Sequence, residues 1–144
     1  MTHLTFVSEF NSYHRMRSEA LDDAENTRIF GKCANPSGHG HRYRIEVTLA
    51  AKVTEKRPYV LPRTEISRLV EEILAPKLRH RNVDEVFGPG FVSSGENLAK
   101  AIWNLIETEL TTEVSLISVK VVETRKNAFV YREESKNSSR QLLI

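Results

Sequence analysis

A period of two in the apolar side chains constrains the fold more than any other feature of this sequence. It runs through residues 4–14 and again through residues 39–49. Successive side chains of a strand point to opposite faces, so each segment predicts a strand with one buried face. The first buried face carries Leu4, Phe6, Ser8, Phe10, Ser12 and His14. The second carries His39, His41, Tyr43, Ile45, Val47 and Leu49. Three histidines therefore fall on the buried side of two predicted strands.

The period of two is lost between and after these strands. Residues 18–28 are charged and poor in apolar side chains, and residues 31–40 are rich in Gly, Pro, Asn and Ser. Both segments are predicted as loops. Helical spacing of apolar residues follows Thr64, a candidate N-cap, and Pro76 is expected to end that helix.

A second helix and two further strands complete the pattern. The helix is expected to start at a capping box formed by Ser93 and Glu96. Residues 117–123 alternate as a third strand, and Phe129 and Tyr131 belong to a fourth. This order predicts an α+β fold, with a four-stranded antiparallel sheet and two helices on one face. The open face and edges of such a sheet favour association into oligomers.

Composition excludes several classes of protein. The chain has 144 residues with 21 Lys and Arg against 19 Asp and Glu, and a net charge of +2 argues against nucleic acid as the main partner. Cys33 is the single cysteine, so no intramolecular disulfide can form. No apolar run approaches the ~20 residues of a membrane span, and no signal peptide is recognisable. We expect one domain over residues 1–132, a polar tail over residues 133–144, and a cytoplasmic protein without a membrane partner.

The three histidines form a candidate metal site. His39 and His41 are two residues apart on one strand, and His14 ends the other strand on the matching face. If the two strands pair, three imidazoles can converge, and three protein nitrogens with an open position are typical of catalytic zinc. The alternative is that each histidine is an ordinary hydrogen-bonded polar residue.

Cys33 and His80 each allow two interpretations. Cys33 lies in a glycine-flanked loop just before two of the histidines, where it is either a small buried apolar side chain or a thiolate base beside a metal. His80, in the segment LRHRN, is either a surface histidine or a proton carrier.

Glu123 and Glu96 are candidate ligand-binding carboxylates. Glu123 falls on the apolar face of the third predicted strand, at its end, where a carboxylate is rare unless it is paired or functional. It could accept two parallel N–H bonds from a 2-amino-4-oxo pyrimidine edge, or it could pair with a lysine or arginine. Glu96 is interpreted either as a helix cap or as part of a binding site.

Five short stretches carry a resemblance to a known family. They are residues 10–14 (FNSYH), 26–43 (NTRIFGKCANPSGHGHRY), 80–82 (HRN), 96–99 (ENLA) and 122–124 (VET). In this order they resemble the 6-pyruvoyltetrahydropterin synthase family and its relative, 6-carboxytetrahydropterin synthase. The block from FGKC to HGH resembles the pyruvoyl enzymes more than the shorter loop of the queuosine-pathway enzymes. The likeness extends over residues 4–131.

The resemblance implies a fold, an assembly and a reaction. The fold would be the tunnelling fold (T-fold), in which sheets join edge to edge into a barrel, and the protein would be a homo-oligomer of trimers stacked into hexamers. The substrate would be 7,8-dihydroneopterin triphosphate. The reaction would eliminate triphosphate and shift protons internally, so the chain would be a carbon–oxygen lyase of tetrahydrobiopterin biosynthesis.

The resemblance also implies roles for single residues. His14, His39 and His41 would be the Zn²⁺ ligands. Cys33 would accept a proton from the substrate, and His80 would be the second proton carrier. Glu123 would anchor the pterin ring. Ser94 and Glu96, in a segment of a neighbouring subunit, would lie near the substrate.

Three departures from the family pattern lie around this site. Arg79 stands where the family usually has an Asp that would orient the following histidine. Ser94 and Gly95 replace a pair of threonines, and Pro62 replaces an Asp or Asn. Because the histidine and cysteine motifs are intact, we expect a working lyase with an altered rate or substrate. Two alternatives stay open: a carboxytetrahydropterin-forming or side-chain-cleaving variant, and a non-catalytic oligomer that binds pterin or metal.

Overall fold

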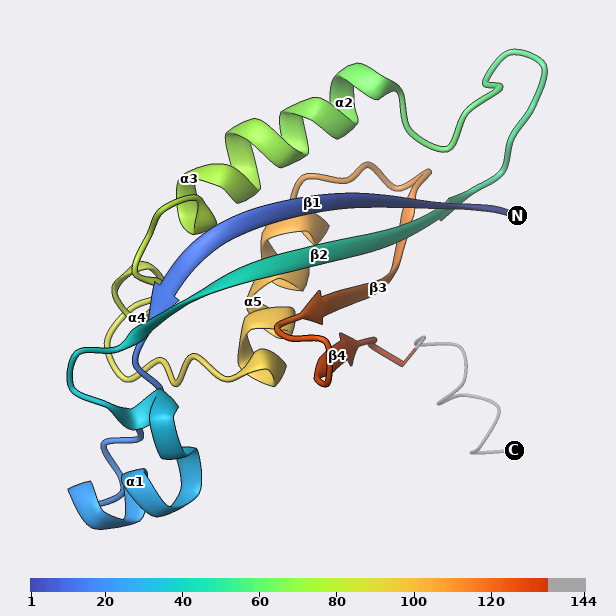
Figure 1. Ribbon diagram of the computed structural model, residues 1–144. Helices are drawn as coiled ribbons and strands as arrows, with labels where there is room; N and C mark the ends of the chain where they lie inside the picture. Colours follow the sequence, from blue (N-terminus) through green and yellow to red (C-terminus); the bar gives the residue numbers. More distant parts are fainter. Residues whose placement is uncertain (135–144) are drawn as a thin grey trace, which may run out of the picture.

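One antiparallel sheet organises the fold, in the strand order β1-β2-β3-β4 (Figure 1). The computed structural model of the chain describes residues 1–134. The strands are β1 (Thr2–His14), β2 (His39–Ala51), β3 (Ser115–Val122) and β4 (Ala128–Tyr131). The helical segments are α1 (Asp23–Phe30), η1 (Gly31–Ala34), α2 (Arg63–Arg68), η2 (Leu69–Leu74), α3 (Ala75–Leu78), α4 (Val83–Val86) and α5 (Gly95–Glu107). Residues 135–144 of the predicted tail lie outside the described part.

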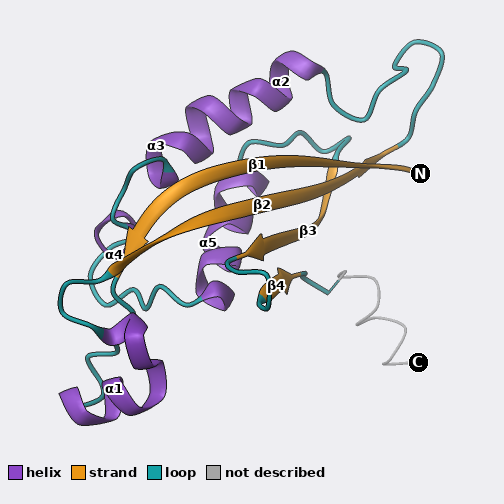
Figure 2. Cartoon of the chain, viewed as in Figure 1, coloured by secondary structure: helices purple, strands orange, loops and turns teal. Residues whose placement is uncertain are grey.

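The predicted four-stranded antiparallel sheet is confirmed, and helices pack against one of its faces. The sheet contributes to the core Phe6, Phe10, Tyr43, Ile45, Val47, Leu49, Val119 and Val121. The helical segments contribute Leu69, Leu74, Leu78, Leu98, Ile102 and Ile106. Burying one such side chain stabilises the fold by roughly 1.5–3 kcal/mol. Figure 2 shows α1 outside this layer, at the end of the sheet where β1 stops and β2 begins. Within residues 1–134 no helix is long and apolar enough to cross a membrane.

The segment over residues 18–28 is not the loop that its composition predicts. Helix α1 begins within it, and Asp22 caps the helix by accepting a hydrogen bond from the Glu25 N–H at 2.8 Å. The Asn26 side chain is buried and donates to three backbone carbonyls. Capping and buried polar contacts order this segment, so apolar spacing could not reveal it.

The helix after Pro62 also differs from its prediction. Pro62, not Thr64, occupies the N-cap position, and the helical path continues to Leu78 instead of ending at Pro76. The segment Leu69–Leu74 takes π-helical turns, and Pro76 falls in the first turn of α3. Pro76 therefore lies inside a continuous helical path, directly after the π-helical turns.

The predicted capping box is also wrong. Ser94 is the N-cap of α5, where its hydroxyl accepts a hydrogen bond from the Asn97 N–H at 3.2 Å. Ser93 is buried, and its hydroxyl donates to Asp84 instead. Glu96 lies exposed in the first turn of α5, where a carboxylate favours the positive end of the helix dipole.

Candidate metal and active site

The pairing of β1 with β2 brings the three histidines together. His14 lies opposite His39, and Ser12 lies opposite His41. The ring centroid of His14 is 5.2 Å from that of His39 and 4.9 Å from that of His41, and the last two are 4.2 Å apart. The convergence expected from the period of two is therefore present in the structure.

Cys33 joins the histidines from outside the sheet. One nitrogen from each of His14, His39 and His41 and the Cys33 sulfur lie within 4.8 Å of one another. The Cys33 Sγ is 3.1 Å from the His39 Nε2. We call these four residues the His–Cys cluster. Three imidazole nitrogens and a thiol are donors that suit Zn²⁺ and its chemical neighbours.

Two unpaired nitrogens support a cation in the His–Cys cluster. The Nε2 atoms of His14 and His41 are buried and have no hydrogen-bond partner among the described residues. A buried polar atom without a partner is costly, and a bound cation would remove that cost. On its other side, the His14 Nδ1 lies 3.1 Å from the Ser93 carbonyl oxygen, the usual arrangement behind a metal-ligating imidazole. The cluster could thus hold a divalent cation.

Glu123 lies directly after β3 and extends into the same site. Its side chain is 8% exposed, and its Oε1 is 2.9 Å from the His41 Nε2 and 3.8 Å from the His14 Nε2. The closer pair is not aligned as a hydrogen bond, since the His41 Nε2 has no such partner. Glu123 therefore faces the region toward which two histidine nitrogens point.

Burial favours the neutral form of His14 and of His41. It is the largest cause that lowers the pKa of His41, to about 4, and the neighbouring His14 and His39 lower it further. Burial also lowers the pKa of His14, against the opposing effects of Ser93 and Asp84. A neutral imidazole has a free lone pair, which metal coordination requires.

Burial acts in the opposite direction on the acidic groups. It raises the pKa of the Cys33 thiol, and the Glu123 carboxylate raises it further. Burial likewise raises the pKa of Glu123, with a smaller contribution from Glu96. Without a nearby positive charge, Cys33 is therefore held as the neutral thiol.

His80 lies apart from the His–Cys cluster. It follows α3 with an exposed side chain, and its backbone N–H donates to the Asn11 carbonyl at 2.7 Å. Its φ of 54° is the one positive value at a non-glycine position within residues 1–134. Arg79 turns to the surface, where its guanidinium contacts Glu71 at 2.8 Å and lies over the Phe10 ring.

Asp84, Ser93 and Tyr43 support the cluster from behind. The Ser93 hydroxyl donates to Asp84 at 2.5 Å, and the Tyr43 hydroxyl oxygen is 3.5 Å from the His14 Nδ1. The sequence predicted no contact of Asp84 or Tyr43 with the histidines, and it assigned Ser93 to a helix cap. Asp84 lies in a segment without a clear period, and the capping pattern that includes Ser93 gave no sign of a contact with His14.

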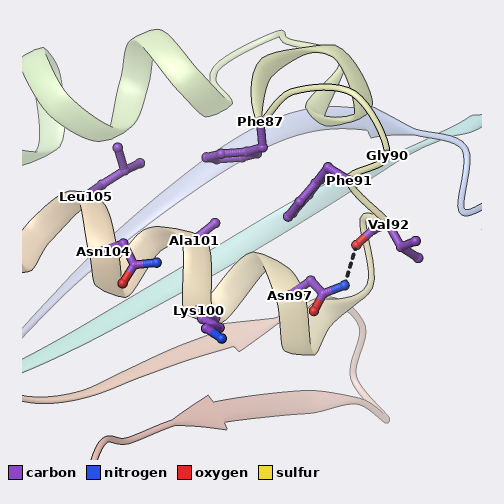
Figure 3. Close-up of a pocket in the computed structure, with 9 residues that line it drawn as sticks. All are labelled: Phe87, Gly90, Phe91, Val92, Asn97, Lys100, Ala101, Asn104 and Leu105. Carbon is purple, nitrogen blue, oxygen red and sulfur yellow. Dashed lines mark hydrogen bonds between the residues drawn. The ribbon is translucent and has the colours of Figure 1, made fainter.

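A separate cavity lies between α5 and the loop that precedes it. It measures about 490 Å³, and Figure 3 shows Phe87 and Phe91 facing Leu105 and Ala101 of α5 across it. Lys100 also lines it, and Asn97 donates to the Val92 carbonyl at its rim at 2.9 Å. None of the residues that line it belongs to the His–Cys cluster.

Comparisons with known proteins agree with this geometry. Residues 3–134 match the family described as 6-pyruvoyl tetrahydropterin synthase. The 6-pyruvoyl tetrahydrobiopterin synthase of Poecilia reticulata is 37% identical over 92% of this chain and 90% of its own length. That of Homo sapiens is 37% identical over 87% of each. The solved structure of the Caenorhabditis elegans 6-pyruvoyl tetrahydropterin synthase superposes with a TM-score of 0.84 at 32% identity, covering 92% of this chain and 96% of that one. This chain therefore belongs to the 6-pyruvoyl tetrahydropterin synthase family.

Proposed function

We propose that this chain is a zinc-dependent lyase that converts 7,8-dihydroneopterin triphosphate to 6-pyruvoyltetrahydropterin and releases triphosphate. The observation that carries the proposal is the His–Cys cluster, whose donor atoms lie within 4.8 Å of one another in a chain of this family. The reaction needs no external oxidant or reductant, because the substrate side chain is rearranged internally while the triphosphate leaves. The binding site and the proton carriers must then come from the protein.

His14, His39 and His41 are proposed as the Zn²⁺ ligands. The unpaired Nε2 atoms of His14 and His41 and the neutral state of both rings support this assignment. When bound there, Zn²⁺ would act as a Lewis acid toward side-chain oxygens of the substrate and would acidify both the adjacent C–H bond and the Cys33 thiol.

Cys33 is proposed as the residue that accepts the substrate proton. Its thiol lies 3.1 Å from a ring nitrogen of His39, at the rim of the cluster. The half-buried position lets it reach a bound molecule while most of the bulk solvent is kept away. A positioned base of this kind contributes roughly 10²–10⁴-fold to a rate.

Glu123 is proposed to anchor the pterin ring. Its carboxylate is nearly covered and stands beside the cluster, so a pyrimidine edge that donates two N–H bonds would offset the cost of burying it. The 2.9 Å approach to His41 also allows Glu123 to be a further ligand of the metal. The variant Glu123→Gln separates the two roles: an anchor loses substrate affinity with zinc retained, whereas a ligand loses zinc.

His80, Ser94 and Glu96 are proposed to complete a site shared between subunits of a homo-oligomer, a trimer or a hexamer. His80 is exposed, and its positive φ is a strained arrangement of the kind found at functional sites. The sheet has β1 and β4 at its edges, where further copies could pair. Sedimentation of the purified protein would give the number of subunits.

Product identification tests the proposed reaction. The zinc-loaded protein is incubated with 7,8-dihydroneopterin triphosphate, and the products are identified by mass. The expected products are triphosphate and 6-pyruvoyltetrahydropterin in equal amounts. A carboxytetrahydropterin, or a pterin that has lost its side chain, would instead indicate the alternative enzymes, and the proposed reaction would be wrong.

Arg79 favours a second candidate, a non-catalytic protein that binds pterin or metal. The Arg79 guanidinium is engaged with Glu71, and no carboxylate at this position orients His80. A non-catalytic protein would bind the pterin with unchanged affinity in Cys33→Ala and would form no product in either form. Turnover by the unmodified chain excludes it.

A further inference from the structure

Asp84 lies behind the His–Cys cluster and uses both of its carboxylate oxygens. Oδ1 accepts a hydrogen bond from the Ser93 hydroxyl at 2.5 Å, and Oδ2 accepts one from the Arg15 backbone N–H at 2.5 Å. The Asp84 backbone N–H donates to the Asn82 side chain, which caps α4. The carboxylate is thereby fixed between α4, the start of α5 and the residue that follows His14.

Ser93 connects this carboxylate to the histidine. Its carbonyl oxygen and its Oγ each lie 3.1 Å from the His14 Nδ1. The single hydroxyl hydrogen of Ser93 is given to Asp84, so Oγ can only accept from His14. A carbonyl oxygen also can only accept. Both oxygens therefore require a hydrogen on Nδ1, which leaves the Nε2 lone pair of His14 free to face the cluster.

His14 depends on this support more than its two partners do. Its side chain is 0% exposed, so no water can select its tautomer. Among residues 1–134, no comparable hydrogen bond is made by the Nδ1 atoms of His39 and His41. The Tyr43 hydroxyl is farther from the His14 Nδ1, at 3.5 Å, and is the weaker contact.

We propose that Asp84 and Ser93 are positioning residues, which hold His14 as the Nδ1–H tautomer and so prepare its Nε2 for the metal. The inference rests on the proposed metal-dependent function. Asp84 acts at two points, because it orients the Ser93 hydroxyl and fixes the backbone at Arg15, next to His14. Partners of this kind behind a ligand typically change metal affinity by about 10–100-fold.

Asp84→Asn is the variant that reverses the hydrogen-bond direction without changing the shape. The Arg15 N–H still needs an acceptor, so the amide oxygen turns toward it and the amide NH₂ faces Ser93. The Ser93 hydroxyl then accepts from the amide and can donate to the His14 Nδ1, where it competes with the Ser93 carbonyl and raises the fraction of the Nε2–H tautomer. Glu85→Gln is the matched control, since Glu85 is exposed on the same short helix and loses the same charge.

Two measurements test the proposal. Ring ¹⁵N signals of the metal-free protein report the tautomer of His14, and competition with a chelator reports the Zn²⁺ affinity. We expect Nδ1–H in the unmodified chain and in Glu85→Gln, and a gain of Nε2–H in Asp84→Asn with about 10–100-fold weaker Zn²⁺ binding. An unchanged tautomer or an unchanged Zn²⁺ affinity in Asp84→Asn overturns the proposal.

The test remains decisive if a variant does not fold. A His14 that carries its hydrogen on Nε2 in the unmodified, metal-free chain overturns the proposal without any substitution. Ser93→Ala supplies a second variant: the carbonyl remains, so we expect Nδ1–H to persist and Zn²⁺ binding to weaken less than in Asp84→Asn. Neither readout involves turnover, so a chain with the expected tautomer and affinity but no product contradicts the proposed reaction alone.

Discussion

The His–Cys cluster is built from two regions of the molecule that are ordered by different forces. The first region is the paired ends of β1 and β2, which supply His14, His39 and His41 through a continuous ladder. The second is the segment over residues 15–38, which connects these strands and supplies Cys33. The first region is ordered by the sheet and its apolar core, whereas the second lies outside that core.

Polar contacts order the second region. Asn26 has a buried side chain that donates to the carbonyls of Ser18, Leu21 and Asp22 and accepts from the Ser18 N–H. The Cys33 carbonyl accepts from the Met16 N–H at 2.6 Å. Contacts of this kind position a backbone without the large apolar burial that fixes a core strand.

The comparison predicts that the proposed metal binding and the proposed proton transfer are separable. A shift of one residue in the β1–β2 register would place His14 on the opposite face from His39 and His41, so the positions of the proposed ligands are strongly specified. Cys33 is held by a few polar bonds outside the sheet and has more freedom to adjust. Substitutions in the first region should act on the metal, and those in the second on turnover.

His41→Ala is expected to remove the metal itself, on which the whole proposed reaction depends. Structural zinc sites contribute about 10–16 kcal/mol through four ligands, so one ligand accounts for roughly 2.5–4 kcal/mol, or about 10²–10³-fold in affinity. We expect stoichiometric Zn²⁺ to be lost, as measured by metal analysis after dialysis. His3→Ala, an exposed histidine on β1, is the control and should keep its zinc. Full zinc in His41→Ala would show that the metal lies elsewhere.

Cys33→Ala should give the opposite result. We expect kcat to fall by about 10²–10⁴-fold because the proton acceptor is lost, while zinc content stays unchanged. Product formation and metal analysis on the same preparation measure both. A parallel loss of zinc would make Cys33 a ligand rather than a base, and the two regions would then not be separable.

The difference in ordering also decides what the sequence could predict. The ladder repeats every two residues, so His14, His39 and His41 could be placed on one face from the period of their strands alone. Helix α1 depends on Asp22 as a cap and on the buried Asn26, single polar residues that produce no period. Its composition therefore predicted a loop.

The same reason explains the residues that were missed around the site. Asp84 and Ser93 act through hydrogen bonds across segments far apart in the chain, and such contacts follow from the tertiary arrangement alone. Pro76 shows the converse error, because it is a strong local signal for a helix end and yet the helical path continues past it to Leu78. Local patterns thus located the three histidines of the cluster but not the residues that contact His14 from behind.

Gly38 lies where the two regions meet, directly before β2. Its φ is +65°, and an added Cβ would lie 2.7 Å from the Tyr13 ring and 2.8 Å from the His14 carbonyl oxygen. Gly31 has a similar φ of +56° with nothing within 4 Å, so Gly31→Ala carries only the backbone cost, about 1–2 kcal/mol. Gly38→Ala should carry the same backbone cost and lower the free energy of unfolding by roughly 1–3 kcal/mol more because of the steric conflict. Equal losses of unfolding free energy in Gly31→Ala and Gly38→Ala, measured by denaturant unfolding, would show that the structure around Gly38 shifts to avoid the conflict.

Asn26→Ala is expected to have the smallest effect and to confine it to the second region. Removing the amide leaves the Leu21 carbonyl and the Ser18 N–H without this partner, whereas the Ser18 and Asp22 carbonyls keep backbone donors, a cost of about 1–3 kcal/mol if the unpaired groups stay buried. We expect this cost to appear as faster amide hydrogen exchange around α1, with exchange in β1 and β2 and the zinc content unchanged. Asn104→Ala, at an exposed position of α5, is the control and should alter none of these. Faster exchange throughout the sheet would mean that the second region supports the first, because the strand ends would then depend on the segment that carries Cys33.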